Sequence, residues 1–345
     1  MNNYSVLLSG MKRLTMVCFA IVMALMAIAE SESRPWITRE PNGTYDVIYS
    51  VKGRVEGGVI AEYLRYEPIP DSSVYQEITW KQMPPSHLIA VNKQTGDRYL
   101  RLEGTNAKEV PSVTLSFTVT FFKVKVDFSK IGKLYPYDKT KAEYKFYTRT
   151  TAEEGEDAVG RFKKWKDTEI PWIRRTSRRL LNDAKGDVLA YVKSAYELVS
   201  EEFEYYADDA PGIHPRNLLQ SVESKRGHCG LRHSVFVTLL RAAGIPARLV
   251  NCNRPSQSPH VWAEFYLETY GWLPVNLARK AGEFSHFGMY DEHCIILTKD
   301  QKVVIKSKSG KLCMLGQTRG QWHWKANGKN GKPIFEFKIQ GTKRK

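Results

Sequence analysis

Residues 227–278 read GHCGLRHSVFVTLLRAAGIPARLVNCNRPSQSPHVWAEFYLETYGWLPVNLA, and the predicted fold rests mainly on this stretch. Apolar residues recur every three or four positions from Leu231 onward, which predicts a helix that begins at Cys229. Gly244 and Pro246 end that helix, since glycine favours a helix C-terminus and proline cannot continue one. Strands are predicted to follow at 247–251, 261–267 and 272–277.

Cys229 stands in the first turn of the predicted helix. Unpaired backbone N–H groups and the positive end of the helix dipole favour a thiolate over a thiol there. The same N–H groups can bind a developing oxyanion. A small core residue is the alternative interpretation, but a core cysteine would not usually follow Arg226-Gly227-His228 at a helix start. We therefore interpret Cys229 as a nucleophile.

His260 opens one predicted strand, and Asn276 lies on the strand that follows it. A hairpin tip centred near Glu268 sets the two residues opposite each other, and a tip one or two residues later leaves them diagonal neighbours. Either arrangement supplies a base that accepts the thiol proton and a polar group that orients the imidazole. Taken singly, His260 is also explained as a loop histidine and Asn276 as a turn former.

Together these segments resemble the transglutaminase-like core, a papain-related fold. The matching segments are GHCG at 227–230, LRAAGIPAR at 240–248, HVWAEFY at 260–266 and GWLPVN at 271–276. The resemblance implies a Cys–His–Asp triad that transfers an acyl group through a thioester, carried here by Cys229, His260 and, in the third position, Asn276. An asparagine can hold the imidazole, but it lacks the full negative charge with which the family's usual aspartate stabilises an imidazolium.

Other residues are weaker candidates for the same site. Tyr205 or Tyr206 is a candidate second oxyanion donor, because relatives use an upstream aromatic residue in this way. Trp262 and Trp272 are candidates for the wall of the active cleft, although core packing explains both.

A structural ion pair and the absence of a metal are also expected. Arg248 and Glu264, on neighbouring predicted strands, are expected to form the ion pair. Cys229 and His233 have metal-ligand spacing but no second pair beside them, so we expect no metal and no cofactor.

Residues 1–29 have the layout of an export signal. Lys12 and Arg13 precede the apolar run 14–29, which ends in the small residues that a signal peptidase reads. We expect cleavage, no lipid anchor at Cys18, and a periplasmic or secreted mature chain without a membrane span.

The mature chain keeps three cysteines besides Cys229: Cys252, Cys294 and Cys313. At most one bridge can form among these three. Cys294 with Cys313 is the expected pair, because a short loop closes readily.

The predicted fold class is α+β, with an N-terminal β-sandwich-like domain at 30–151 and a transglutaminase-like, papain-like core at 187–282. A linker with surface helices at 152–186 joins them, and a C-terminal β extension at 283–345 ends in a hairpin. A bulge at Phe121-Phe122 is expected to keep both halves of one long strand on a single core.

Three residues are expected to bound helices within the predicted core. Asp187 is expected to cap one helix, Pro215 to begin another and Gly227 to end it.

Composition indicates a globular protein, with 42% hydrophobic and 12% aromatic residues. Removal of residues 1–29, which carry two basic residues and no acid, lowers the net charge from +15 to +13. Such a charge favours acidic partners such as envelope polymers, anionic lipid surfaces or acidic proteins. A solvated basic surface explains it equally well, and the dispersal of the charge argues against nucleic acid.

We expect an exported thiol enzyme that acts on amide bonds of peptides, proteins or peptidoglycan-type substrates, with hydrolysis favoured over transamidation. The alternatives are a catalytically weakened envelope or polysaccharide-binding protein and an acyltransferase of the arylamine N-acetyltransferase type. The extra β domain and the export signal make the acyltransferase the less favoured of these.

Overall fold

In the computed structural model, the described residues are 34–206, 214–255, 259–277, 286–300, 303–306, 312–315, 321–327 and 332–344. The predicted export signal, residues 1–29, lies outside these ranges. Within them, no helix combines the length and the apolar character needed to cross a membrane.

The N-terminal part consists mainly of strands: β1 (Ile37–Glu56), β2 (Val59–Ile69), β3 (Gln76–Gln82), β4 (Ile89–Val91), β5 (Arg98–Ala107) and β6 (Val113–Val126), with 3-10 turns at Ser86–Leu88 and Phe128–Lys130. The middle of the chain adds α2 (Ala142–Tyr147), β7 (Ala152–Glu156), β8 (Phe162–Lys166), a 3-10 turn at Asp167–Glu169, α3 (Pro171–Asp183), α4 (Val188–Glu202), β9 (Glu204–Tyr205), α5 (Leu218–Ser224), β10 (Arg226–Gly227) and α6 (Cys229–Ala242).

The remaining strands are β11 (Ala247–Asn253), β12 (Pro259–Leu267), β13 (Gly271–Val275), β14 (Met289–Tyr290), β15 (Ile295–Lys299), β16 (Val303–Lys306), β17 (Leu312–Leu315), β18 (Gln321–Asn327) and β19 (Lys332–Lys343). Mixed helices and strands in this order confirm the predicted α+β class.

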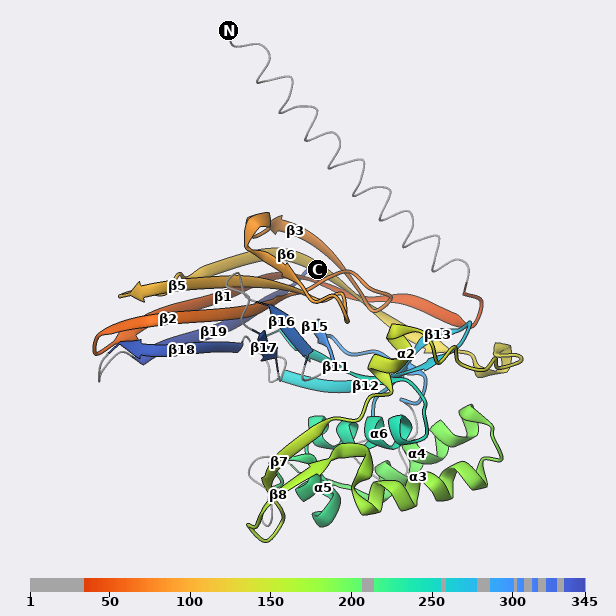
Figure 1. The fold of residues 1–345 in the computed structure, drawn as a ribbon. Helices are drawn as coiled ribbons and strands as arrows, with labels where there is room; N and C mark the ends of the chain where they lie inside the picture. The colour runs from red at the N-terminus through yellow and green to blue at the C-terminus, as the bar shows by residue number, and fades with distance from the viewer. Residues whose placement is uncertain are drawn as a thin grey trace.

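The elements form layers (Figure 1). One sheet has the order β14-β6-β1-β19 with β3 beside β6, and a second has the order β18-β2-β5-β4. Apolar side chains from both sheets, including Ile60, Leu102 and Val113, pack together as expected for a sandwich. A third sheet, β13-β12-β11-β15, lies between this region and the helices.

The C-terminal strands do not form the predicted hairpin with each other. β19 pairs with β1, with Ile339 opposite Tyr49, and β18 pairs with β2, with Trp324 opposite Tyr63. Each strand therefore completes a different N-terminal sheet. The alternating pattern of the two segments predicted strands correctly but carried no information about partners more than 250 residues earlier in the chain.

β6 also differs from the prediction. The register irregularity does lie opposite Phe121-Phe122, but its extra residue is on β1, between Pro41 and Gly43. The first half of β6 packs into one cluster through Phe121, and the second half packs into another through Phe122. The two halves thus face different cores, because the N-terminal sheet contacts more than one layer.

The third sheet is covered on both faces. Leu249 and Phe265 face a large cluster with helices α3 to α6, whereas Val250 and Trp262 pack with Phe122 from the N-terminal sheet. Gln76 of β3, itself buried, makes two hydrogen bonds to the backbone of Ile296, of 3.0 and 2.7 Å. The N-terminal sheets are therefore a fixed support for the sheet that carries the candidate site.

The helix boundaries confirm one prediction and correct two. The Asp187 side chain caps α4 by accepting hydrogen bonds from two backbone N–H groups. Asn217, not Pro215, caps α5, because its side-chain oxygen accepts from the Gln220 N–H. Lys225, not Gly227, ends α5 in the left-handed conformation.

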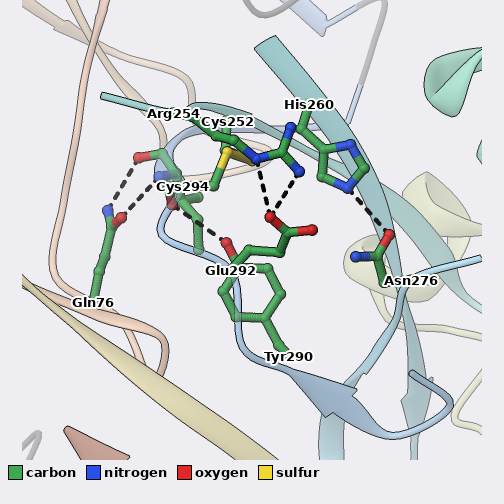
Figure 2. Close-up of a disulfide and its surroundings, with 9 residues drawn as sticks. Gln76, Cys252, Arg254, His260, Asn276, Tyr290, Glu292 and Cys294 are labelled. Carbon is green, nitrogen blue, oxygen red and sulfur yellow. Dashed lines mark hydrogen bonds and ion pairs between the residues drawn. A yellow bond between two sulfur atoms is a disulfide. The ribbon is translucent and has the colours of Figure 1, made fainter. Parts of the chain in front are cut away.

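The disulfide joins Cys252 of β11 to Cys294, so the expected Cys294–Cys313 pair is wrong (Figure 2). The two bonded residues are 42 positions apart in sequence, with Cα atoms 5.5 Å apart. Pairing of β11 with β15 brings them together. The prediction failed because it used loop length alone, whereas sheet pairing determines which cysteines meet.

The disulfide should contribute to stability. The variant Cys252→Ala/Cys294→Ala should lose about 4 kcal/mol of unfolding free energy in urea titrations, since the cross-link restricts a 42-residue loop in the unfolded chain. Cys313→Ala is the matched control and should unfold like the unmodified protein. A non-reduced peptide map that joins Cys294 to Cys313 would contradict the pairing.

Candidate functional site

Cys229 is the first residue of α6, as predicted, and its side chain is half-buried. His228 precedes the helix and caps it, because its Nδ1 accepts a hydrogen bond of 3.1 Å from the Gly230 N–H. The helix ends at Ala242, before Gly244 with its positive φ. The candidate nucleophile is thus at the positive end of a regular 14-residue helix dipole.

Gly227 does not end a helix but lies in a crowded position before α6. A Cβ atom built there would lie 3.0 Å from the Leu231 Cβ and 3.1 Å from the Ser221 Oγ. Gly227 also pairs with Tyr205 in the short parallel β9–β10 ladder. A side chain at position 227 would therefore press on Leu231 and Ser221 at the turn into α6.

His260 and Asn276 are in contact. The hairpin of β12 and β13 pairs Leu267 with Gly271, so its tip is at Thr269 and the two residues are diagonal neighbours. His260 Nε2 and Asn276 Oδ1 are 3.1 Å apart (Figure 2). Since the amide oxygen only accepts, Nε2–H is the donor, and the Nδ1 lone pair of this tautomer is a base.

His233 joins α6 to the chain just after Asn276. Its Nδ1–H donates to the Cys229 carbonyl oxygen at 2.7 Å, and its Nε2 accepts from the Leu277 N–H at 2.9 Å. Its ring centroid is 6.2 Å from that of His260. The contacts of this one side chain bring the start of α6, the His260 ring and the end of β13 into one neighbourhood.

The His233 imidazole is neutral. Burial lowers its pKa well below the usual histidine range, and His260 lowers it further. In the sequence, His233 was a candidate only for metal binding, although its spacing of four residues from Cys229 places both on one face of the helix. That spacing was the available signal.

Arg248 and Glu264 form the expected ion pair, buried and 2.6 Å long. Tyr75 donates a hydrogen bond of 2.8 Å to the same carboxylate, and Trp272 stacks 3.8 Å from the guanidinium carbon. Burial lowers the pKa of Arg248, but the carboxylate outweighs that effect and the pKa is raised overall. The pair links β11 to β12, the strand that carries His260.

The structure distinguishes among the weaker candidates for the site, Tyr205, Tyr206 and Trp262. Tyr206 is buried and its hydroxyl donates to the Pro215 carbonyl at 3.1 Å, so that hydrogen is not available for an oxyanion. Tyr205 is only partly buried, opposite Gly227. Trp262 is 0% exposed and packs against Tyr75 and Tyr290, as the core-packing alternative predicted.

In the part of the chain that the structure describes, no three His, Cys, Asp or Glu side chains are grouped so that they could hold a metal ion.

Residues 174–277 match the model of the transglutaminase-like superfamily, which confirms the resemblance over the predicted core. The fold is similar to that of a candidate cysteine protease from Cytophaga hutchinsonii, at 10% identity and a TM-score of 0.50, over 88% of this chain and 92% of that one. At this identity the similarity is one of fold.

Two further solved structures are more distant. The periplasmic domain of TgpA from Pseudomonas aeruginosa has 12% identity and a TM-score of 0.33, over 63% of this chain and 86% of that one. Red sea bream transglutaminase has 11% identity and a TM-score of 0.31, over 68% of this chain and 47% of that one. No curated protein sequence matches the chain.

An aspartate in place of Asn276 should change the titration of His260. In Asn276→Asp, a carboxylate beside Nε2 would stabilise the imidazolium, so the His260 midpoint followed by NMR should rise by about 1 to 3 pH units. Asn276→Ala removes the hydrogen bond without adding charge and should give no such rise. Equal midpoints in the aspartate variant and the unmodified protein would contradict the contact.

Proposed function

We propose that this protein is an exported thiol enzyme that cleaves amide bonds of peptides or peptidoglycan-type substrates through a thioester at Cys229. The observation that carries the proposal is the His260–Asn276 hydrogen bond beside a helix whose first residue is a cysteine. In residues 1–29, two basic residues precede an apolar run, and this order supports the export part of the proposal.

In the proposed reaction, His260 Nδ1 takes the proton from the Cys229 thiol. The thiolate attacks the amide carbonyl carbon, and backbone N–H groups at the start of α6 stabilise the oxyanion. Tyr205 is the proposed second donor, since the Tyr206 hydroxyl is engaged elsewhere. The C–N bond then breaks as the imidazolium protonates the leaving amine, which leaves a thioester.

The second half of the proposed reaction releases the acyl group. Water attacks the thioester carbonyl while His260 accepts its proton, and the C–S bond breaks to regenerate Cys229. Water needs no second binding site, so hydrolysis is the simpler outcome, and an amine in place of water would give transamidation.

The role of Asn276 is to hold the imidazole of His260 in one tautomer. Because an amide carries no full negative charge, it stabilises the imidazolium less than an aspartate does. This weaker stabilisation is the observation that favours the second candidate function, a catalytically weakened envelope-binding protein.

A basic face on α3 supports acidic envelope polymers as partners under either function. Arg174, Arg175, Arg178 and Arg179 are exposed, and among the described residues none of the four forms an ion pair. Arg174 and Arg178 are like charges four residues apart on α3, and so are Arg175 and Arg179. Like charges at this spacing destabilise a helix. An anionic polymer with carboxylate or phosphate groups would offset that repulsion.

Product formation should depend on Cys229. Incubation with peptide and peptidoglycan libraries should give cleaved products by mass spectrometry, and hydroxylamine should trap the acyl group as a hydroxamate. Cys229→Ala should yield neither, whereas the matched control Cys313→Ala should retain both. Equal product from the protein and from Cys229→Ala would remove the assigned nucleophile.

Binding to an anionic polymer should depend on the face of α3. Replacing its four arginines with glutamine should abolish retention on immobilised polyuronate, and retention of the unmodified protein should fall steeply with salt. The matched control removes the same charge from exposed lysines elsewhere, at Lys52, Lys93, Lys108 and Lys123. An equal loss in both variants would show that net charge alone is responsible.

A further inference from the structure

His233 occupies an unusual position for a histidine that takes no part in the proposed chemistry. It is 1% exposed, and both ring nitrogens are hydrogen-bonded to backbone groups. One bond is within α6, to the carbonyl of Cys229, and the other crosses to the Leu277 N–H. Ordinary core packing would need neither bond, since an apolar side chain could fill the same space.

Each of the two peptide groups it binds adjoins a residue of the proposed site. The Cys229 carbonyl belongs to the candidate nucleophile itself, and the Leu277 N–H belongs to the peptide that follows Asn276. The imidazole is rigid and planar, so the separation of its two nitrogens fixes the separation of the two peptides. A small misplacement of reacting groups is enough to slow a reaction strongly.

We infer that His233 is a positioning residue that sets the distance between the Cys229 thiol and the imidazole held by Asn276. It acts by fixing the first turn of α6 against the end of β13. This inference rests on the proposed function and assigns to His233 no contact with substrate.

The charges around His233 agree with this role. His260 on β12 and Arg232 on α6 are the titratable or charged groups that act on it besides the Cys229 backbone. A protonated His233 would lose its acceptor for the Leu277 N–H and would repel an imidazolium at His260. A neutral ring keeps the link and allows His260 to carry the proton.

The test compares three replacements. His233→Gln can still accept from the Leu277 N–H, since its amide reaches as far as Nε2. His233→Asn reaches only as far as Nδ1 and keeps the bond within α6, and His233→Leu keeps neither. Tyr191→Phe is the matched control, because Tyr191 is equally buried and donates a 2.7 Å hydrogen bond to Leu239 near the other end of α6.

The readout is the rate of alkylation of Cys229 by iodoacetamide as a function of pH, with amide exchange of Leu277 measured by NMR. We expect His233→Asn and His233→Leu to react about tenfold more slowly near neutral pH, with midpoints moved toward that of a free thiol. His233→Gln, which keeps only the bond to Leu277, should react at a rate between those of the unmodified protein and His233→Leu. Tyr191→Phe should stay near the unmodified protein, and the Leu277 amide should exchange faster only in His233→Asn and His233→Leu.

Three results would overturn the inference, and they distinguish its failure from the failure of the proposed function. An activated Cys229 whose rate is unchanged in His233→Leu, or is reduced equally in Tyr191→Phe, removes the inference alone. A Cys229 that reacts no faster than an unfolded-chain thiol in the unmodified protein removes the proposed function and the inference together. If His233→Leu does not fold, the contrast between His233→Gln and His233→Asn decides.

Discussion

The sheet β13-β12-β11-β15 is constrained on both faces, and the candidate site depends on that constraint. Helices α3 to α6 cover one face through Leu249 and Phe265, and the N-terminal sheet covers the other through Phe122. Every residue of β11 is buried as a result. β11 pairs with β12 along its whole length, from Ala247 opposite Phe265 to Asn253 opposite Pro259, so the two-sided packing of β11 also holds His260 of β12 in place.

The same constraint explains why the N-terminal and C-terminal parts of the chain cannot be separated from the core. β14 adds to β6, β18 and β19 complete the two N-terminal sheets, and the Cys252–Cys294 disulfide fastens β11 to the segment before β15. Cys252 lies directly opposite His260 in the β11–β12 ladder. The support of the candidate histidine is therefore covalent as well as hydrophobic.

Local features of the sequence predicted the local features of the site. The helix start at Cys229, its end before Gly244 and the diagonal pairing of His260 with Asn276 follow from periodicity and hairpin geometry, which act over a few residues. The disulfide, the partners of β18 and β19 and the bridging role of His233 depend on contacts between distant segments. Hydrophobic periodicity does not predict contacts between distant segments. Only the spacing of His233 from Cys229 indicated in advance that His233 lies beside the site.

The central claim is that the first turn of α6, together with an imidazole held by Asn276, makes Cys229 a thiolate near neutral pH. The most direct measurement is the ultraviolet absorbance of the thiolate as a function of pH, taken as the difference between the unmodified protein and Cys229→Ser. The account predicts a thiolate that persists well below the free-thiol pKa of about 8.5. A difference signal that titrates at or above that value would contradict it.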